Sequence, residues 1–430
     1  MNYSERLNNV IPGGAHTYSR GDDQYPSNAP QILLRGEGAY VWDADGNKFL
    51  DYGMALRAVT VGYGYKPIAQ AAIEQIYNGN NLTRASVIEL QAAELLVDTI
   101  PSAEMVKFAK NGSTVTTAAV KIARAYNGRK YIAICAQHPF FSYDDWFIGS
   151  TPLTRGVPDE ISNLTLKFNF NDISSLEKLF EKYPDQISCV ILEPATNVEP
   201  VDNFLGKVQQ LCKKNGAVFI LDEMITGFRW HLKGAQKYYN VEPDLCTFGK
   251  GMANGFSVAA LAGKREIMQI GGINKDGAER VFLVSTTHGA EMCGLGAFVK
   301  TVEVYKELDV VNKIWSYGRK LMNGVNDIAK KCGIEKFFYI EGCPCSPNYV
   351  TKDRDGNVSL ELRTLFSQEM IKNKVLIPWV ALSCAHGDVE LDITLKAIES
   401  ALKVYSLVLE TGVNKYLQGK AMKPVFRKYN

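Results

Sequence analysis

Four ionisable residues of this 430-residue chain directly follow runs of β-branched and aliphatic residues. Glu193 follows CVIL, Asp222 and Glu223 follow AVFIL, and Lys250 follows LCTFG. Ligands of open α/β sheets bind beyond the carboxyl ends of the strands, so we expect these side chains to meet at one sheet edge. A partly desolvated lysine there has a lowered pKa and can form a Schiff base with an aldehyde. For any one of these residues alone, a solvated surface position is the more common explanation.

Together the residues fit a site for pyridoxal phosphate. This cofactor needs a lysine for its aldehyde, a carboxylate at its pyridinium nitrogen and a cup for its phosphate. Asp222 is the candidate carboxylate, which would keep the ring nitrogen protonated. The sequence NGST at 111–114 follows the strand-like VKFAK and opens a helical pattern, so its N–H groups and hydroxyls could hold an anion. On its own, such a helix start is more often a plain N-terminal cap.

A sheet and its covering helices must position these residues. Short β-branched runs alternate with amphipathic stretches, which is typical of an α/β fold with a parallel sheet. We predict strands at 131–135, 188–192, 217–221, 245–248 and 258–262. We predict helices at 172–183, at 203–214 and at 113–127, the last beginning at a Ser/Thr cap and ending at Gly128.

The two ends of the chain differ from this central region. Asp45 and Gly46 separate two alternating segments in AYVWDADGNKFLDYG, which predicts an antiparallel hairpin. After about residue 290 the pattern returns to helices and a few strands, with a long helix at 389–408. We therefore expect a large α/β domain over 66–300 and a small domain formed by 1–65 and 301–430.

The composition excludes several classes of protein. Lys and Arg total 48 against 46 Asp and Glu, so no net field would attract nucleic acid or an anionic membrane. The N-terminus has no basic region followed by an apolar one, and no long uncharged apolar run follows, which predicts a cytoplasmic location. Nine scattered cysteines do not suggest a disulfide framework, and neither they nor the five histidines have metal-ligand spacing. We expect no metal.

Five segments then resemble one family in order and spacing along nearly the whole chain. They are IPGGAHTYSR, GEGAYVWDADGNKFLDY, KNGSTVTTAAVKIARAYNGR, LDEMITGFR and PDLCTFGKGMANGFSVAALAG. Each resembles a segment of the class III pyridoxal-phosphate aminotransferases, in the branch similar to glutamate-1-semialdehyde 2,1-aminomutase. The resemblance implies the type I fold of pyridoxal-phosphate transferases, with a large, mostly parallel central sheet domain and a small α+β domain built from both chain ends.

The resemblance also implies roles around the cofactor ring. Lys250 would form the Schiff base and carry the proton between the substrate Cα and the cofactor. Asp222 would pair with the pyridinium nitrogen, and Met224 would pack on one face of the ring. Glu193 and Asn197 match the segment that lies near the cofactor hydroxyl.

Further matches concern the phosphate, the substrate and a second subunit. Ser113 and Thr114, with the backbone of Gly112, would hold the phosphate. Thr287, which follows a predicted strand at 281–285, would reach the phosphate of the neighbouring subunit, so the resemblance implies a homodimer with shared sites. Arg20 falls where the aminomutase has an arginine for a substrate carboxylate.

The sequence departs from the family pattern around the cofactor. The segment AQHPFFSYDDWFIG replaces Tyr-His-Gly and is a few residues longer. Phe140 or Phe141 could supply the aromatic face of the cofactor, with His138 nearby as a substrate contact, but a core role for both phenylalanines is an equal alternative. Val115 stands where the family has an acid, and STTHGAE at 285–291 replaces the aminomutase's GTLSGNP.

These features favour an aminotransferase that moves an amino group from a donor, by family default glutamate, to an aldehyde or ketone. An aminomutase or another pyridoxal-phosphate isomerase is the alternative, and a non-enzymatic binding protein fits poorly because both Lys250 and Asp222 are present. The pattern FFSYDDW resembles enzymes of surface-polysaccharide pathways, so an amino-sugar precursor or a similar metabolite is a candidate acceptor.

Overall fold

The computed structural model describes residues 1–138, 140–274 and 276–430, and the chain divides into two compact units. Unit 1 combines Met1–Tyr65 with Asn312–Arg427, and unit 2 combines Lys66–Val311 with Lys428–Asn430. Within the described part of the chain, we find no helix with the length and hydrophobicity that crossing a membrane requires.

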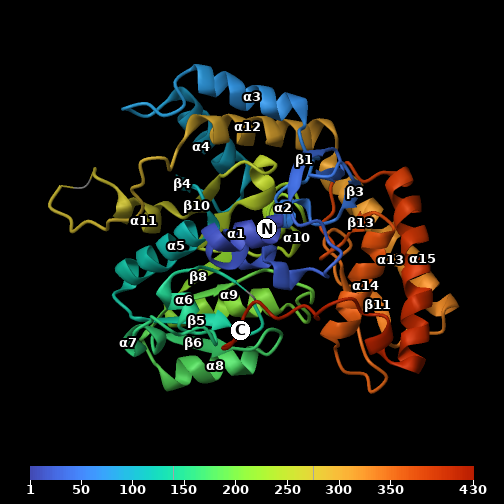
Figure 1. Cartoon of the computed structure of the whole chain (residues 1–430). Helices are drawn as coiled ribbons and strands as arrows, with labels where there is room; N and C mark the ends of the chain where they lie inside the picture. Colours follow the sequence, from blue (N-terminus) through green and yellow to red (C-terminus); the bar gives the residue numbers. More distant parts are fainter. Residues whose placement is uncertain (139, 275) are drawn as a thin grey trace. The chain divides into compact units, whose positions relative to one another are not determined.

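Unit 2 is built on a seven-stranded sheet in the order β4-β10-β9-β8-β7-β5-β6 (Figure 1). Neighbouring strands from β6 to β9 run parallel, whereas β10 is antiparallel to both β4 and β9. The mostly parallel sheet predicted from the sequence is therefore confirmed, and the five strands predicted between 131 and 262 lie within one residue of their observed bounds. The strands are β4 (Met105–Ala109), β5 (Tyr131–Cys135), β6 (Thr165–Phe168), β7 (Ile187–Leu192), β8 (Val218–Asp222), β9 (Leu245–Phe248) and β10 (Ala259–Gly263).

Helices connect these strands. Asn111, and not a serine or threonine, caps the N-terminus of α5, and the predicted strand at 281–285 is wrong because these residues form no strand. The helices are α3 (Lys66–Tyr77), α4 (Val87–Thr99), α5 (Gly112–Asn127), α6 (Asp145–Ile148), α7 (Asp159–Ser162), α8 (Ile173–Lys182), α9 (Phe204–Asn215), α10 (Gly234–Tyr238), α11 (Arg265–Met268) and α12 (Met292–Glu307), with short 3-10 turns η4 (Lys250–Ala253) and η5 (Gln269–Gly271).

The centre of the sheet is buried on both faces. Every residue of β7 and β8 is buried, which explains why their sequences are continuously apolar instead of alternating. On one face, Phe168, Val190 and Phe219 pack with Leu176 of α8 and Val208 of α9 in a single apolar cluster.

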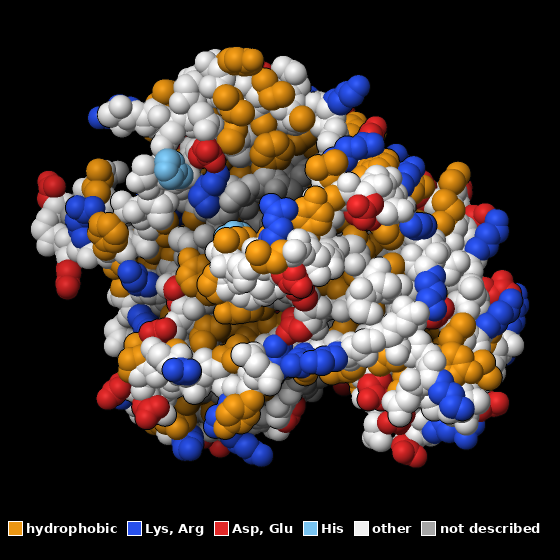
Figure 2. Space-filling model, viewed as in Figure 1, with side chains coloured by type: hydrophobic (Ala, Val, Ile, Leu, Met, Phe, Trp, Pro, Cys, Tyr) orange, Lys and Arg blue, Asp and Glu red, His pale blue; other side chains and the backbone are white. Residues whose placement is uncertain are grey.

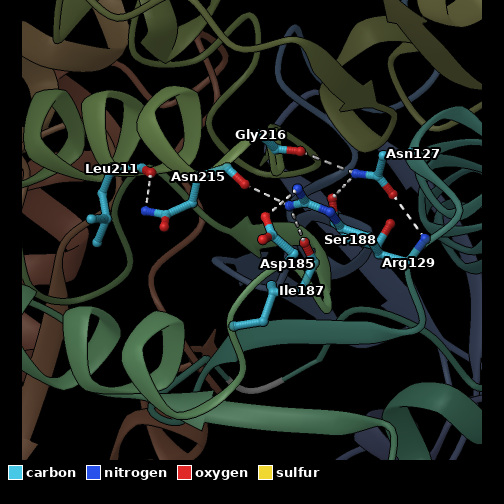
Figure 3. Close-up of polar contacts among 8 residues, drawn as sticks. All are labelled: Asn127, Arg129, Asp185, Ile187, Ser188, Leu211, Asn215 and Gly216. Carbon is cyan, nitrogen blue, oxygen red and sulfur yellow. Dashed lines mark hydrogen bonds and ion pairs between the residues drawn. The ribbon is translucent and has the colours of Figure 1, made fainter.

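The C-terminal end of α5 is fixed to the start of the sheet (Figure 3). The amide of Asn127 donates to the carbonyl oxygens of Ser188 (2.9 Å) and Gly216 (3.3 Å). The Arg129 guanidinium donates to the Ile187 and Asn215 carbonyls and pairs with Asp185 at 3.1 Å. Because these contacts lie where β7 and β8 begin, the N-terminal end of α5 extends toward the edge where those strands end.

Unit 1 contains a four-stranded sheet in the order β1-β2-β3-β13 and a separate two-stranded one. The predicted hairpin is confirmed: β2 and β3 are antiparallel, and the Asp43 side chain accepts from the N–H groups of Asp45 and Asn47 in the turn. The strands are β1 (Leu33–Glu37), β2 (Tyr40–Asp43), β3 (Lys48–Asp51), β11 (Phe338–Glu341), β12 (Asn348–Thr351) and β13 (Val375–Leu376).

The helices of unit 1 include the long C-terminal helix expected from the sequence, which extends from Asp388 to Thr411. One short element, α2, has positive φ angles at all four of its residues, none of which is glycine. A left-handed turn costs roughly 1–2 kcal/mol per residue with a Cβ atom, so other contacts must hold it. The helices are α1 (Tyr3–Val10), α2 (Met54–Arg57), α13 (Val310–Lys331), α14 (Leu360–Lys372) and α15 (Asp388–Thr411), with 3-10 turns η1 (Pro12–Gly14), η2 (Tyr18–Arg20), η3 (Asp22–Gln24) and η6 (Val413–Lys415).

Candidate active site

The carboxyl ends of β7, β8 and β9 bring three polar residues into register. Leu192 pairs with Leu221, and Asp222 pairs with Thr247, so Glu193, Asp222 and Thr247 lie on adjacent strands at one edge. Lys250 follows Thr247 by three residues at the start of η4. The sequence-based expectation that the acids and the lysine share one sheet edge therefore agrees with the strand register.

Asp222 is a buried carboxylate that two donors hold in place. Its Oδ1 accepts from the Met224 N–H (3.0 Å) and from the Thr247 hydroxyl (3.0 Å). Burial raises its pKa from 3.8 to about 6, while the positive charge of Lys250 acts in the opposite direction. A second cation at this carboxylate would reduce the cost of burying its charge, which is what a protonated ring nitrogen supplies.

Lys250 adopts a backbone conformation that is uncommon for a residue with a side chain. Its φ is 44°, and the side chain is half-buried. Such strain in an ordered segment is concentrated at functional sites. Gly249 precedes it, and a Cβ atom there would come within 2.6 Å of the Met224 Sδ. Met224 thus packs closely against the backbone that leads into the lysine.

The N-terminus of α5 provides the candidate phosphate cup. The Asn111 side chain accepts from the N–H of Thr114 (2.9 Å) and from its hydroxyl (3.1 Å). Gly112 and Ser113 occupy the first two helical positions, whose N–H groups have no acceptor within a helix. A Cβ atom on Gly112 would lie 3.1 Å from the Met224 Sδ, so α5 and the Lys250 backbone both approach Met224.

These observations agree with a bound pyridoxal phosphate. The buried carboxylate can accept a hydrogen bond from a cationic ring nitrogen, and the N–H groups of the helix start can donate to a phosphate. Met224 lies between Gly112 and Gly249, where a side chain can contact the face of a ring.

The aromatic segment separates into buried and exposed members. Phe141, Trp146 and Phe147 are buried and pack on one another. Phe140 is 46% exposed, with its ring 5.7 Å from that of Phe147, and Tyr143 is also exposed. Of the two phenylalanines considered from the sequence, Phe141 is therefore a core residue, and Phe140 is the one that can meet a ligand.

His138 is not an exposed substrate contact. It is 6% exposed, and its Nδ1 accepts from the backbone N–H of Glu193 at 3.0 Å. Burial lowers its pKa to about 3, so the ring is neutral and carries its proton on Nε2. Nε2 is buried without a hydrogen-bond partner among the described residues. His138 thus connects the end of β7 to the aromatic segment.

The remaining acids and amides at this edge differ in their roles. Glu193 is buried, whereas Asn197 lies exposed in the following turn. Glu223, one of the acids noted in the sequence, is fully buried and accepts from the N–H groups of Ala235 and Gln236 at the start of α10. Glu223 thus has a structural role. Its position next to Asp222 in the sequence does not indicate this role.

Thr287 lies in an exposed turn before α12. Its carbonyl accepts from the Asn81 side chain at 3.0 Å, which ties the turn to the segment between α3 and α4. Nearby, Lys110 pairs with Glu291 at 2.6 Å, and the pair is about three-quarters buried. Because its two members are far apart in the chain, no local sequence pattern indicates this ion pair.

Arg20 belongs to unit 1 and lines a cavity of that unit. Arg20 lies at the C-terminal end of η2 and is exposed. An exposed guanidinium beside a cavity is suited to bind a carboxylate through two parallel hydrogen bonds.

Sequence comparisons identify relatives over most of the chain. A family model described as Aminotransferase class-III matches residues 23–337. The glutamate-1-semialdehyde 2,1-aminomutase of Francisella philomiragia subsp. philomiragia is 33% identical over 333 residues, which cover 74% of this chain and 76% of that protein. The 3-aminobutyryl-CoA aminotransferase of Cloacimonas acidaminovorans is 30% identical over 412 residues, which cover 94% and 96% of the two chains.

Solved structures give the same result for the fold. The pyridoxal-phosphate internal aldimine form of FumI from Sphingopyxis sp. MTA144 has a TM-score of 0.86 and 26% identity, covering 96% of this chain and 98% of that one. An omega-transaminase from Sphaerobacter thermophilus has a TM-score of 0.84 and 25% identity, covering 94% and 97%. With the register of Asp222 and Lys250, these matches show that the chain belongs to the class III aminotransferases, a family of pyridoxal-phosphate enzymes with the type I fold.

Proposed function

We propose that this enzyme transfers an amino group from glutamate to an aldehyde or ketone, with an amino-sugar precursor or a similar metabolite of surface-polysaccharide synthesis as the acceptor. The observation that carries the transaminase assignment is the shared strand edge of Asp222 and Lys250, beside the N-terminus of α5. The proposed acceptor class rests only on the resemblance of the FFSYDDW segment to enzymes of surface-polysaccharide pathways. A cytoplasmic location remains a prediction.

The cofactor, when bound, supplies an aldehyde that takes up the amino group and a ring that accepts electrons from the substrate Cα. Lys250 Nζ would bind that aldehyde and would move the proton at the substrate Cα. Asp222 would keep the ring nitrogen protonated, Met224 would pack on one ring face, and Phe140 is the candidate for the other. Glu193 is the buried acid that we assign to the cofactor hydroxyl side.

The phosphate is held by the N–H groups of Gly112 and Ser113 at the α5 N-terminus, with the hydroxyls of Ser113 and Thr114. Ser113 already accepts from the Tyr143 N–H at 3.1 Å, which orients its hydroxyl. In unit 1, Arg20 would bind a carboxylate of the substrate.

We further propose a homodimer in which Thr287 of each chain reaches the phosphate of the other. Its exposure in a turn held by Asn81 supports this role. Apolar side chains also gather over α3 at the top of Figure 2, where Ile73, Ile76 and Tyr77 are between 41% and 87% exposed. An exposed apolar helix face of this kind is typical of an interaction surface.

An aminomutase is the second candidate, because several relatives at 30–33% identity carry the name glutamate-1-semialdehyde 2,1-aminomutase. A donor and acceptor screen on the purified enzyme separates the two. A transaminase given glutamate releases 2-oxoglutarate in an amount equal to the cofactor, even without an acceptor. A mutase interconverts isomers of one substrate and releases no keto acid. Isomer interconversion without release of a keto acid from any donor would refute the transaminase.

A further inference from the structure

The left-handed turn α2 in unit 1 is an unusual local structure. The φ angles of Met54, Ala55, Leu56 and Arg57 are 39°, 48°, 61° and 68°. Residues with a Cβ atom disfavour this region, and runs of them are rarer still. Strain of this kind persists only where surrounding contacts determine the conformation.

Two side chains supply those contacts. Asp51 is buried, and its carboxylate accepts from the N–H groups of Gly53 (2.7 Å) and Met54 (2.9 Å) and from the Tyr63 hydroxyl (2.7 Å). The same hydroxyl accepts from the Ala55 N–H at 2.8 Å. Tyr63 therefore links the carboxylate at the start of the turn to the backbone within it.

The rest of the turn is also fixed to unit 1. Met54 is fully buried against Val59 and Ala381, and the Trp379 indole donates to the Gly53 carbonyl at 3.1 Å. Beyond the turn, the Val59 N–H donates to the Met54 carbonyl at 3.1 Å. These contacts hold the backbone on both sides of Ala55 and Leu56.

This turn forms part of the wall of a cavity of about 630 Å³, which lies entirely within unit 1. Arg20, Asp51, Ala55, Leu56, Tyr63 and Trp379 are among its lining residues. Burial raises the pKa of Tyr63 above its ordinary value and Asp51 adds to the rise, while the positive charge of Arg20 opposes it. Arg20 and Tyr63 both line this cavity.

We propose that Tyr63 is a positioning residue, whose hydroxyl holds the left-handed turn so that Ala55 and Leu56 form part of the wall of the cavity in which Arg20 binds a carboxylate. The inference rests on the proposed function, because it assumes that the substrate carries a carboxylate. It predicts that loss of the hydroxyl weakens binding of the acid and leaves cofactor loading unchanged.

The test uses the holoenzyme and glutarate, a dicarboxylate with no amino or carbonyl group to exchange, titrated by calorimetry. We expect wild-type protein to bind glutarate, and Arg20→Met to lose most of that affinity. Tyr63→Phe keeps the aromatic ring and removes the hydroxyl that donates to the Asp51 carboxylate. We therefore expect the affinity for glutarate to fall about tenfold. The visible band of the bound cofactor stays unchanged. For the amino donor found by the screen, KM rises and kcat does not.

A second substitution in the Tyr63→Phe background distinguishes a positioning role of Tyr63 from a general loss of protein stability. Glycine adopts positive φ without steric cost, so Ala55→Gly in the Tyr63→Phe background should restore part of the glutarate affinity. Tyr405→Phe is the matched control, since this buried tyrosine donates to the Phe337 and Lys352 carbonyls and does not line the cavity.

Three results would each overturn the proposal: no glutarate binding by the wild type, unchanged affinity in Tyr63→Phe, or no recovery in the double variant. Release of 2-oxoglutarate tests the transaminase separately. The proposed function can therefore survive failure of this inference, and a failed donor screen leaves the glutarate series informative.

Discussion

Replacing the buried carboxylate of Asp222 by an amide should stabilise the cofactor-free protein while impairing its chemistry. The Asp222 pKa is 3.8 unfolded and about 6 folded, because burial disfavours the charge. Between these values the folded state retains a proton that the unfolded state has lost, so stability decreases as the pH rises from about 4 to 6. A difference of about two pH units corresponds to about 3 kcal/mol.

Asp222→Asn removes this penalty, because the amide retains an Oδ1 that can accept from Met224 and Thr247. At pH 7.5 we expect the variant to gain up to about 3 kcal/mol in urea unfolding of the cofactor-free protein. Hydrogen exchange of β8 amides would show the same gain, which should shrink toward pH 4. Cofactor affinity and the rate of Cα proton loss should both fall.

Glu223→Gln is the matched control at the next position. Both Glu223 oxygens accept from N–H or hydroxyl donors of Thr226, Ala235 and Gln236, so an amide nitrogen there would face a donor. This variant should lose stability at pH 7.5. An Asp222→Asn variant that is no more stable than wild type at pH 7.5, or whose gain in stability does not depend on pH, would show that burial of the Asp222 charge does not destabilise the protein.

Three other predictions concern single residues. Lys250→Ala should give no cofactor-labelled peptide after borohydride reduction, and mass spectrometry finding equal labelling would remove Lys250 from its assigned role. Thr287→Ala should weaken cofactor binding and lower activity in the dimer, and an active monomer seen by sedimentation across dilution would contradict the shared site. The His138 pKa is lowered to about 3 by burial, so the folded state takes up no proton between pH 6.5 and 4 while the unfolded state does. Stability should therefore decrease as the pH falls through this range, and the His138 ring proton should show no NMR titration near pH 6.5.

The sequence was sufficient for five of the seven strands of the central sheet, because their signals are local, whereas β4 and β6 were not among the predicted strands. Buried strands such as 131–135 and 245–248 are short apolar runs between helical patterns, and both match β5 and β9 residue for residue. The edge occupied by Asp222 and Lys250 followed from parallel topology. The resemblance supplied the roles, which the strand order alone does not carry.

Other features depend on contacts that no local pattern encodes. Residues 281–285 form a short apolar, β-branched run such as a buried strand would have. A strand also needs a pairing partner, and the Phe282 carbonyl instead accepts from the Lys121 side chain at 3.2 Å. The left-handed turn at Met54–Arg57 contains neither glycine nor asparagine, the usual signals for positive φ. Its conformation results from Asp51 and Tyr63, which act from outside the turn.

The contacts of Asn127 and Arg129 at the strand starts have a consequence for engineering the enzyme. At 16 residues and 1.5 Å per residue, α5 places them about 24 Å from the proposed phosphate cup. A library aimed at new acceptors should therefore exclude these two positions, although neither would touch a ligand. Substitutions there would let the whole helix shift along its axis, and a screen for activity would record the resulting loss of cofactor as a failure of substrate design.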